Sequence, residues 1–501
     1  METYTNSIAA QVMTLLVDLF IALLGLGIIA VIIIFIIDVT QSAHTIRRNY
    51  PVIGRFRYWF EHLGEFFRQY FFAMDREELP FNRAERGWAY RASKNIDRNL
   101  SFGSTRDLTP TGTVMFMNSA FPTLANDVSP PAPLTIGNDC RTPYTTASFY
   151  NISAMSYGAL SKPAVSALAQ GAKEANCWMN TGEGGLSPYH LASGCDLVFQ
   201  IGTAKYGVRT PKGELCNQKL KEVASHAQVR MFEIKLSQGA KPGKGGILPA
   251  GKVSAEIAAI RSIPEGEASI SPNGHPDIRS AEDLLDMIHR VRTITGKPVG
   301  FKAVVGEQDW LLDLIQLIKE RGACSAPDFI TIDSADGGSG AAPQPLMDYV
   351  GLPLKESLPW LCDQLEAHNL RDRIKVIASG KLITPSKVAW ALAVGADFVV
   401  SARGFMFALG CIQALQCSKN TCPTGITTHN KKLQRGLVPS NKAKRVAHYH
   451  RNMSYGVGLI THACGVQEPR QLTRKHVRIV MQHGLSIPLD ELHPPQNITV
   501  Q

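Results

Sequence analysis

Short apolar runs alternate with helix-like patterns over most of the chain from about residue 148. Each run is almost continuously apolar, which is typical of parallel strands that are buried on both faces of a sheet. Between the runs, apolar residues recur with the period of a helix, and Ser161, Ser280 and Thr384 stand where N-caps are expected. The eight runs cover residues 149–156, 175–185, 197–204, 231–239, 299–306, 328–338, 375–381 and 398–404.

Eight strand–helix units in succession predict an α/β protein, a closed (β/α)8 TIM barrel. A doubly wound open sheet is the alternative that the pattern leaves open. Glycine and polar residues stand at the ends of the runs, and the carboxyl ends of barrel strands are where active sites are built. We therefore expect the functional residues at these strand ends.

A long apolar segment lies near the start of the chain. Residues 12–37 carry one charge, Asp18, and as a helix they are about 39 Å long against a hydrocarbon core of ~30 Å. We expect one membrane-crossing helix rather than a signal peptide, because no basic segment precedes the run and no small-residue cleavage site follows it. Arginines follow the run and none precedes it, which predicts that the bulk of the chain, after the run, lies on the cytoplasmic side.

Residues 55–72 interleave aromatic and charged side chains. This pattern favours an amphipathic helix at the membrane interface, and a helix packed on the soluble part of the chain is the alternative. We expect four parts: a transmembrane anchor over 1–40, a juxtamembrane segment and extension over 41–147, the barrel over 148–440 and a helical C-terminal cap over 441–501.

The composition is that of a packed globular protein, with 45% hydrophobic and 19% charged residues among 501. Lys and Arg number 52 against 42 Asp and Glu, a net charge of +10. The basic residues do not form the dense runs of a nucleic-acid-binding protein, so we expect no nucleic acid partner. An anionic substrate or an acidic membrane surface explains the excess. The ten cysteines are irregularly spaced and do not suggest a secreted disulfide framework.

Three glycine-rich segments stand at the ends of the last three apolar runs: DGGSGAAP at 336–343, ASGK at 378–381 and SARG at 401–404. Loops in this part of a barrel commonly hold a phosphate group, although glycines also serve simple turns. Lys302 stands in the middle of the apolar run VGFKAV. A lysine there either pairs with a core carboxylate or points at a bound ligand.

Three cysteines stand close together on one segment. Cys411, Cys417 and Cys422 have the spacing C-x5-C-x4-C, and Pro423 follows the last. Three thiolates on a short segment suit an iron–sulfur cluster with three protein ligands. A zinc site with His429 as the fourth ligand and three unconnected buried cysteines are the alternatives.

Five motifs together resemble the FMN-binding synthase domain of glutamate synthases. They are SAMSYGALS (153–161), NTGEGG (180–185), EIKLSQGAKPGKGG (233–246), DGGSGAAP and the cysteine segment RGFMFALGC…CSKNTCPTG. They occur in order along the barrel region, and the chain is most similar to the stand-alone, membrane-anchored members of this family. The resemblance implies an oxidoreductase that acts on CH–NH2 donors.

The resemblance also implies cofactors and site residues. It makes Cys411, Cys417 and Cys422 the ligands of a 3Fe–4S cluster. It implies that Lys241 and Arg261 bind the carboxylates of 2-oxoglutarate, with Glu183, Lys241 and Lys302 as catalytic residues. FMN would be bound by Ala154, Met155 and Ser156 at the ring, by Gln200 and Lys302 at its pyrimidine edge, and by Gly337, Gly338, Gly380, Arg403 and Gly404 at the phosphate.

We therefore expect reductive amination of 2-oxoglutarate to L-glutamate by a single-pass membrane protein in the lipid bilayer. Ammonia would come from a separate source, such as a glutaminase partner, and electrons from a separate donor. Two departures from the family pattern, Lys244 and Ile247, favour one alternative, and the lack of recognisable glutaminase and electron-input domains favours another. One is a related amino-acid or N-alkylglutamate synthase or dehydrogenase, and the other is a membrane-tethered electron-transfer module without ammonia chemistry.

Overall fold

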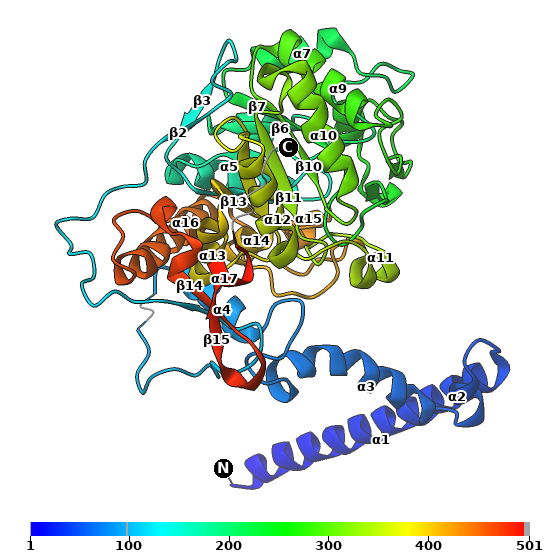
Figure 1. Ribbon diagram of the computed structural model, residues 1–501. Helices are drawn as coiled ribbons and strands as arrows, with labels where there is room; N and C mark the ends of the chain where they lie inside the picture. The colour runs from blue at the N-terminus through cyan, green and yellow to red at the C-terminus, as the bar shows by residue number, and fades with distance from the viewer. Residues whose placement is uncertain (1, 97–98, 495–501) are drawn as a thin grey trace. The chain divides into compact units, whose positions relative to one another are not determined.

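The computed structural model describes residues 2–96 and 99–494, except the side chains of residues 2–7 and 66. The chain divides into two compact units, Met1–Arg83 and Ala84–Gln501 (Figure 1). Each unit is described separately below.

The first unit consists of helices. They are α1 (Glu2–Thr40), α2 (Thr45–Asn49), α3 (Gly54–Phe67) and the π-helical turn η1 (Arg68–Phe72). Over Ile8–Thr40, α1 is the one helix of the described chain that is long and apolar enough to cross a membrane. The expected amphipathic segment is thus helical throughout, but its last five residues widen into a π-helical turn.

An ion pair fixes the turn between α1 and α3. The fully buried carboxylate of Asp38 accepts hydrogen bonds from Arg55 Nη2 at 2.8 Å, from Arg55 Nε at 2.9 Å and from the Val52 backbone N–H at 3.0 Å. A Cβ atom added to Gly54 would lie only 2.8 Å from the carbonyl oxygen of Ile46, so only glycine fits there. Large aromatic side chains on the following helical segment are exposed: Phe56, Trp59, Phe60, Phe71 and Phe72.

The second unit contains a closed barrel of eight parallel strands, which confirms the predicted TIM barrel and excludes the open sheet. Each apolar run contains one strand. In barrel order the strands are β4 (Tyr150–Ile152), β5 (Met179–Asn180), β6 (Leu197–Ile201), β7 (Val229–Lys235), β10 (Val299–Ala303), β11 (Phe329–Asp333), β12 (Lys375–Ser379) and β13 (Phe398–Ser401).

Helices surround the barrel strands (Figure 1). Ser161 and Ser280 cap their helices as expected, because their hydroxyls accept hydrogen bonds from the Ala164 and Asp283 N–H groups. Thr384 occupies the N-cap position, but its side chain makes no capping bond. The helices of this region are α5 (Lys162–Ala175), α6 (Pro188–Leu191), α7 (Asn217–Ser225), η2 (Ala250–Lys252), α8 (Ala255–Arg261), α9 (Ala281–Thr295), α10 (Asp309–Arg321), η3 (Ala323–Ser325), α11 (Gln344–Tyr349), α12 (Leu354–Ala367), α13 (Pro385–Val394) and α14 (Arg403–Leu409).

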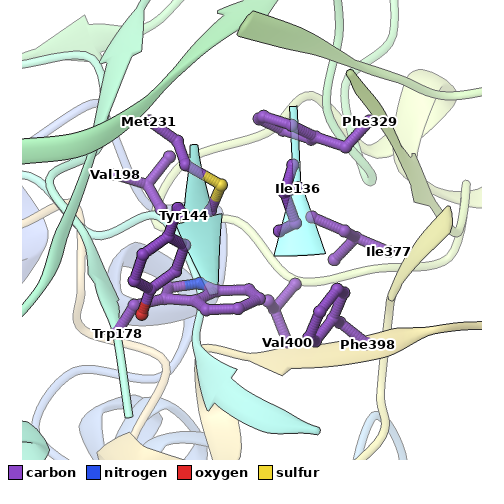
Figure 2. Packing of buried hydrophobic residues seen from close by; sticks show 9 residues of the cluster. All are labelled: Ile136, Tyr144, Trp178, Val198, Met231, Phe329, Ile377, Phe398 and Val400. Carbon is purple, nitrogen blue, oxygen red and sulfur yellow. The ribbon is translucent and has the colours of Figure 1, made fainter. Parts of the chain in front are cut away.

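A β-hairpin closes the barrel at the amino ends of its strands. The hairpin is formed by β2 (Leu134–Ile136) and β3 (Tyr144–Thr146). Its Ile136 and Tyr144 pack into an apolar cluster with Trp178, Val198, Met231, Phe329, Ile377, Phe398 and Val400 (Figure 2). Because this end is filled, the opposite end, with the strand carboxyl termini, is the open one.

The rest of the second unit lies outside the barrel. It comprises α4 (Arg83–Ser93), β1 (Val114–Phe116), the two-stranded insertion β8 (Ile247–Leu248) and β9 (Ser269–Ile270), α15 (Lys431–Gln434), α16 (Pro439–Ala463), η4 (Pro469–Gln471), η5 (Arg474–His476), β14 (Val477–Val480), η6 (Gln482–Gly484), β15 (Ser486–Pro488) and α17 (Leu489–Leu492). The expected C-terminal cap is built on α16, and it also contributes β14 and β15, which form a three-stranded sheet with β1.

Candidate functional site

A buried carboxylate lies inside the open half of the barrel. Glu233 of β7 accepts hydrogen bonds at Oε1 from Asn180 Nδ2 (2.8 Å) and Gln200 Nε2 (2.7 Å), and at Oε2 from Thr331 Oγ1 (2.7 Å). The three donors come from β5, β6 and β11. These bonds fix the position of Gln200, which the resemblance assigns to flavin binding.

Lys302 of β10 pairs with a carboxylate at the end of the next strand. Its Nζ lies 3.1 Å from Asp333 Oδ2, and Asp333 in turn accepts bonds from Ser379 Oγ (2.7 Å) and the Gly239 N–H (2.8 Å). Two roles were expected for Lys302, an ion pair with a core carboxylate or a contact with a bound ligand. It pairs with a carboxylate, and it also lines a cavity inside the barrel.

This cavity has an apolar side and a polar side. The apolar side is formed by members of the hairpin cluster, namely Trp178, Val198, Met231, Phe329, Ile377 and Val400, and the polar side by Ser153, Asn180, Glu233, Lys302 and Thr331. The cavity has room for about one water molecule, so it is a small space between the apolar core and the polar groups of the barrel.

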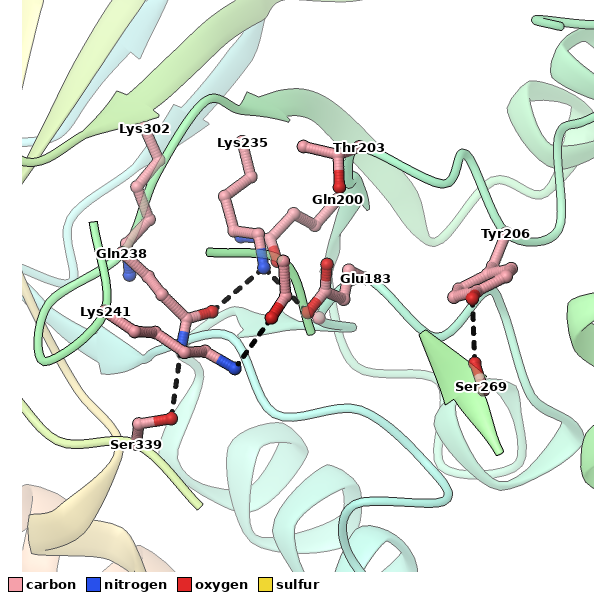
Figure 3. Close-up of polar contacts among 12 residues, drawn as sticks. Glu183, Gln200, Thr203, Tyr206, Lys235, Gln238, Lys241, Ser269, Lys302 and Ser339 are labelled. Atoms are coloured by element: carbon pink, nitrogen blue, oxygen red, sulfur yellow. Dashed lines mark hydrogen bonds and ion pairs between the residues drawn. The ribbon is translucent and has the colours of Figure 1, made fainter. Parts of the chain in front are cut away.

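Glu183 lies among cations at the mouth. Its Oε1 is 2.8 Å from Lys235 Nζ, and Lys235 also donates to Gln238 Oε1 at 2.9 Å (Figure 3). Within the described part of the chain, Glu183 Oε2 is buried and has no hydrogen-bond partner. Burial alone would raise the pKa of Glu183, but Lys235, Lys241 and Arg261 outweigh it and the net shift is downward. Glu183 is therefore a carboxylate with one oxygen available.

Lys241 and Arg261 are both buried cations. Among the described residues, the Nζ of Lys241 has one hydrogen-bond partner, the Gly245 carbonyl oxygen at a long 3.5 Å, and burial together with Lys235 and Lys244 lowers its pKa. The Arg261 side chain donates to Ser269 Oγ at 3.1 Å and to the Tyr157 carbonyl at 3.4 Å. Among the described residues, neither cation forms an ion pair with a carboxylate, although both lie near enough to Glu183 to lower its pKa, and both are therefore able to bind an anion.

The segment that the resemblance places against the flavin ring lies beside β5. A Cβ on Gly182, where φ is +65°, would be 2.6 Å from the Ser156 backbone nitrogen and 3.0 Å from the Met155 carbonyl carbon. Met155 and Ser156 are buried, and Ala154 is partly exposed. The glycine therefore permits this close approach of two strand ends at the barrel mouth.

The glycine loops after β11 and β12 and the start of α14 come together. A Cβ on Gly338 would lie 3.0 Å from Arg403 Nε, and one on Gly380 would lie 2.3 Å from the Ser334 Cβ. Gly337 lies in the same loop as Gly338, and Gly404 packs against Tyr449. Arg403 donates to the Ser339 carbonyl at 2.7 Å. Gly338 is exposed and Gly380 partly exposed, and such backbone next to a guanidinium is chemically suited to a phosphate, whereas Gly337 and Gly404 are buried.

Arg403 also reaches the cysteine segment. Its Nη1 lies 3.7 Å from Cys417 Sγ. Burial alone would lower the pKa of Arg403, but Cys417, Cys411 and Cys422 outweigh it and the net shift is upward. Among the described residues, however, no three His, Cys, Asp or Glu side chains converge on one metal-ion position. His429, the zinc alternative, instead bonds the Gly158 carbonyl at 2.8 Å.

A second cation, Lys252, supports the cysteine segment. Its buried Nζ donates to the carbonyl oxygens of Cys417 (2.9 Å) and Thr427 (2.5 Å). Burial lowers the pKa of Lys252, while Cys417 and Cys422 oppose that shift. The Cys422 sulfur lies 3.3 Å from Thr424 Oγ1. The thiols thus share a region with the buried Lys252 and the partly buried Arg403, which suits a negatively charged group.

Sequence comparisons identify the family to which the chain belongs. Residues 123–467 match the family described as a conserved region in glutamate synthase. This chain belongs to the glutamate synthase family. It is an oxidoreductase, as the family resemblance implied, and the match covers the barrel together with the cysteine segment and α16.

The proteins similar to this chain align with different fractions of its length. The chain is 38% identical to the glutamate synthase large subunit-like protein YerD of Bacillus subtilis, over 96% of this chain and 98% of that protein. It is 35% identical to an archaeal glutamate synthase [NADPH] of Methanocaldococcus jannaschii, over 66% of this chain and 61% of that protein. Among solved structures, a mandelate oxidase variant aligns with a TM-score of 0.46 and 14% identity, over 79% and 98% of the two chains.

Several polar groups of the mouth were not anticipated from the sequence. Lys235, Glu233 and Asp333 each hold a predicted site residue, namely Glu183, Gln200 and Lys302. These residues could have been found from the sequence, because each is a charged residue within an apolar run, as Lys302 is.

Proposed function

We propose that this glutamate synthase family member reduces the imine formed from 2-oxoglutarate and ammonia to L-glutamate, with FMN and a 3Fe–4S cluster. The observation that carries the proposal is the charge arrangement at the barrel mouth. Among the described residues, Lys241 and Arg261 form no ion pair with a carboxylate, and the Oε2 atom of Glu183, whose pKa both cations lower, has no hydrogen-bond partner. A dicarboxylate that carries a cationic nitrogen matches this arrangement of charges.

The residues present are suited to FMN. The segment 154–156, at the open end of the barrel, would lie against the flat ring. Lys302 and Gln200 are held in fixed positions by Asp333 and Glu233, where they can bind a polar ring edge. Gly337, Gly338, Gly380, Gly404 and Arg403 would hold the phosphate.

The three cysteines are compatible with a cluster although they do not surround one ion. In a three-iron cluster with three protein ligands, each thiolate binds a different iron, so the sulfur atoms need not converge on one point. Arg403 and Lys252 would balance the negative charge of such a cluster. When bound, FMN supplies hydride transfer and the cluster supplies one-electron transfer.

The chain's own residues would then bind and orient the substrate. Lys241 and Arg261 would hold its two carboxylates by charge-assisted hydrogen bonds. Glu183, kept ionised by Lys235, would bind the nitrogen and accept a proton from ammonium through its unpaired Oε2. Lys302 would stabilise negative charge at the ring edge of the cofactor.

Ile247 favours a second candidate, an N-alkylglutamate synthase. A Cβ on the preceding Gly246 would lie 2.3 Å from Glu183 Oε1, so the β8–β9 insertion reaches the nitrogen site. Ile247 pairs with Ile270, and the two side chains are 40% and 68% exposed. An apolar surface there would accommodate an alkyl group on the amine. Rates with methylamine and ammonium distinguish the two reactions, and Ile247→Gln should shift the preference toward ammonium.

We also propose that α1 anchors the protein in a membrane, with the barrel on the cytoplasmic side. The exposed apolar helix Ile8–Thr40 and the arginines that follow it support this. Alkaline carbonate should leave the protein in the membrane fraction of the cells that make it. Proteases added outside intact cells should spare the barrel. Release by carbonate would contradict the anchor, and digestion of the barrel would contradict the orientation.

The experiment that tests the proposed function follows nitrogen into product. Detergent-solubilised protein, reduced by dithionite, is supplied with 2-oxoglutarate and 15N-ammonium, and labelled glutamate is measured by mass spectrometry. The intact protein should form labelled L-glutamate. Lys241→Met should lower the rate at limiting 2-oxoglutarate by about tenfold or more, since a charge-assisted hydrogen bond contributes roughly 1.5–3 kcal/mol.

The matched control is Lys221→Met, on an exposed helix face of α7. It should change neither the rate nor the extent of flavin reduction. Absence of labelled glutamate from a protein that contains both cofactors would reject the reaction. A Lys241→Met variant as active as the control would reject the assigned substrate contact.

A further inference from the structure

The helix α4 precedes the region that matches the glutamate synthase family, but it packs against that region. The family match begins at residue 123, and α4 ends at Ser93. Ala89 and Ala92 of α4 are fully buried, and the Ala92 carbonyl accepts a hydrogen bond from Asn452 Nδ2 of α16 at 2.7 Å. These contacts fix this part of α4 within the second unit.

Two further contacts hold α4 in place. The Glu85 carboxylate pairs with Lys387 Nζ of α13 at 2.5 Å. The Trp88 ring packs edge-on against the Tyr449 ring of α16, with the ring centroids 5.7 Å apart. Because these contacts come from two different helices, they fix the rotation of α4 about its axis as well as its position.

Tyr90 of α4 reaches the first cysteine of the cysteine segment. Its hydroxyl donates to the Cys411 carbonyl oxygen at 2.6 Å, and its ring packs edge-on against Phe407 of α14, with the ring centroids 5.9 Å apart. The Cys411 backbone N–H donates to the Met406 carbonyl at 3.0 Å. The Cys411 backbone is thus held on both sides, by α14 through its N–H and by Tyr90 through its carbonyl.

The chain that follows Cys411 has little regular structure of its own. The structure describes every residue of 411–417, and none of them belongs to a helix or a strand. Gln413 and Leu415 have φ angles of +57° and +54°, a conformation that residues other than glycine rarely adopt. Such a conformation persists only where the surrounding structure holds it.

Two side chains from outside the segment hold the carbonyl groups of two of its cysteines. Tyr90 binds the carbonyl of Cys411, and Lys252 binds that of Cys417. Tyr90 comes from the extension before the barrel, and Lys252 from the insertion between β8 and β9. Both bonds engage the backbone, so they orient the cysteines and leave the sulfur atoms available.

We propose that Tyr90 is a positioning residue for the 3Fe–4S cluster, because its bond to the Cys411 carbonyl fixes the direction of the first cysteine ligand. The inference rests on the proposed function, which makes Cys411 a ligand of the cluster. Hydrogen-bond partners outside the ligand set orient metal ligands and tune the metal. The hydroxyl also directs the positive end of its dipole at the ligand residue, which favours the more negative, reduced state of the cluster.

The test is the rate at which detergent-solubilised, full-length holoprotein loses iron to ferrozine under dithionite, well below its unfolding temperature. Tyr90→Phe should lose iron about fivefold faster than the unaltered protein, the factor expected when one hydrogen bond no longer opposes local opening of the segment. The midpoint potential of its cluster, measured by a redox titration followed by electron paramagnetic resonance, should also be more negative.

Two control variants separate this bond from other effects. Tyr349→Phe removes a hydroxyl from an 83% exposed side chain of α11 and should change neither quantity. Trp88→Phe weakens the packing of α4 itself. It should lower the thermal unfolding midpoint at least as much as Tyr90→Phe, but leave the rate of iron loss and the midpoint potential near those of the unaltered protein.

Either of two results would overturn the proposal. In the first, Tyr90→Phe and Tyr349→Phe lose iron at equal rates and have equal midpoint potentials. In the second, Trp88→Phe matches Tyr90→Phe in both quantities, which would make the effect one of helix packing.

Failure of the proposed function looks different. If freshly prepared, unaltered protein shows no iron–sulfur absorption, the cluster assignment fails, and the role of Tyr90 fails with it. If the cluster is present and responds to Tyr90→Phe as expected, but no glutamate forms, the positioning role stands and the substrate assignment fails.

Discussion

Glu183 shows how single charges decide the chemistry of the barrel mouth. A buried carboxyl group would ordinarily be protonated more readily, because burial disfavours the charged form. Here three cations reverse the effect, and Lys235 at 2.8 Å is the nearest contact. The proposed role of Glu183 as a base depends on that reversal.

Replacing Lys235 by methionine should therefore raise the pKa of Glu183, because burial is then opposed only by the more distant cations. Activity that needs the carboxylate is present above this pKa and is lost as the pH falls through it. The acidic limb of the kcat/KM profile should move to higher pH by about one unit or more, equivalent to ~1.4 kcal/mol per unit.

Lys235→Arg is the matched variant, since it keeps the charge, and its acidic limb should stay near that of the unaltered protein. Equal profiles for the methionine and arginine variants would show that Lys235 does not set the ionisation of Glu183.

Some residues of the site can be read from the sequence and others cannot. Lys302 is visible as a charge in an apolar strand, and Cys411, Cys417 and Cys422 through their spacing. The pairings of Glu183 with Lys235 and of Lys302 with Asp333 join segments far apart in the chain. Only closure of the barrel brings such partners together, so no local pattern could reveal them.

At the scale of elements, the eight strands were predictable because each is an apolar run long enough to recognise. The hairpin β2–β3 was not, because two three-residue strands are too short to show a period. The hairpin is important through its tertiary contacts, because Ile136 and Tyr144 pack against residues of the barrel strands and close the barrel. The prediction of a membrane-interface position for the helical segment 54–72 stays a prediction, as do the domain boundaries at 147 and 440.

The hairpin should contribute strongly to stability. Ile136 is fully buried, and replacing it by alanine should lower the unfolding free energy by about 2–5 kcal/mol, through lost burial and the cavity left behind. Thermal unfolding of the detergent-solubilised chain, followed by circular dichroism, measures the effect.

Leu124→Ala is a suitable control, because Leu124 is 67% exposed in the same extension. It should change the midpoint little. A midpoint for Ile136→Ala no lower than that of the control would mean that the hairpin is not part of the stabilising core.

The whole molecule combines an oxidoreductase barrel with a segment fit to cross a membrane, and its net charge is concentrated beside its cysteines. The net charge of +10 can be counted from the sequence, but the sequence does not show where the basic residues lie in the folded protein. In the structure, α15 and α16 lie next to the cysteine segment, so several of these lysines and arginines are close to it.

One measurement tests the central claim most directly: the anaerobic absorption spectrum of the reduced, detergent-extracted protein after substrates are added. The proposed function predicts flavin and iron–sulfur bands, and rapid flavin reoxidation only when 2-oxoglutarate and ammonium are both present. The proposed function would be contradicted if both sets of bands appear but the flavin stays reduced. This must hold when 2-oxoglutarate is added with ammonium and also when it is added with an alkylamine.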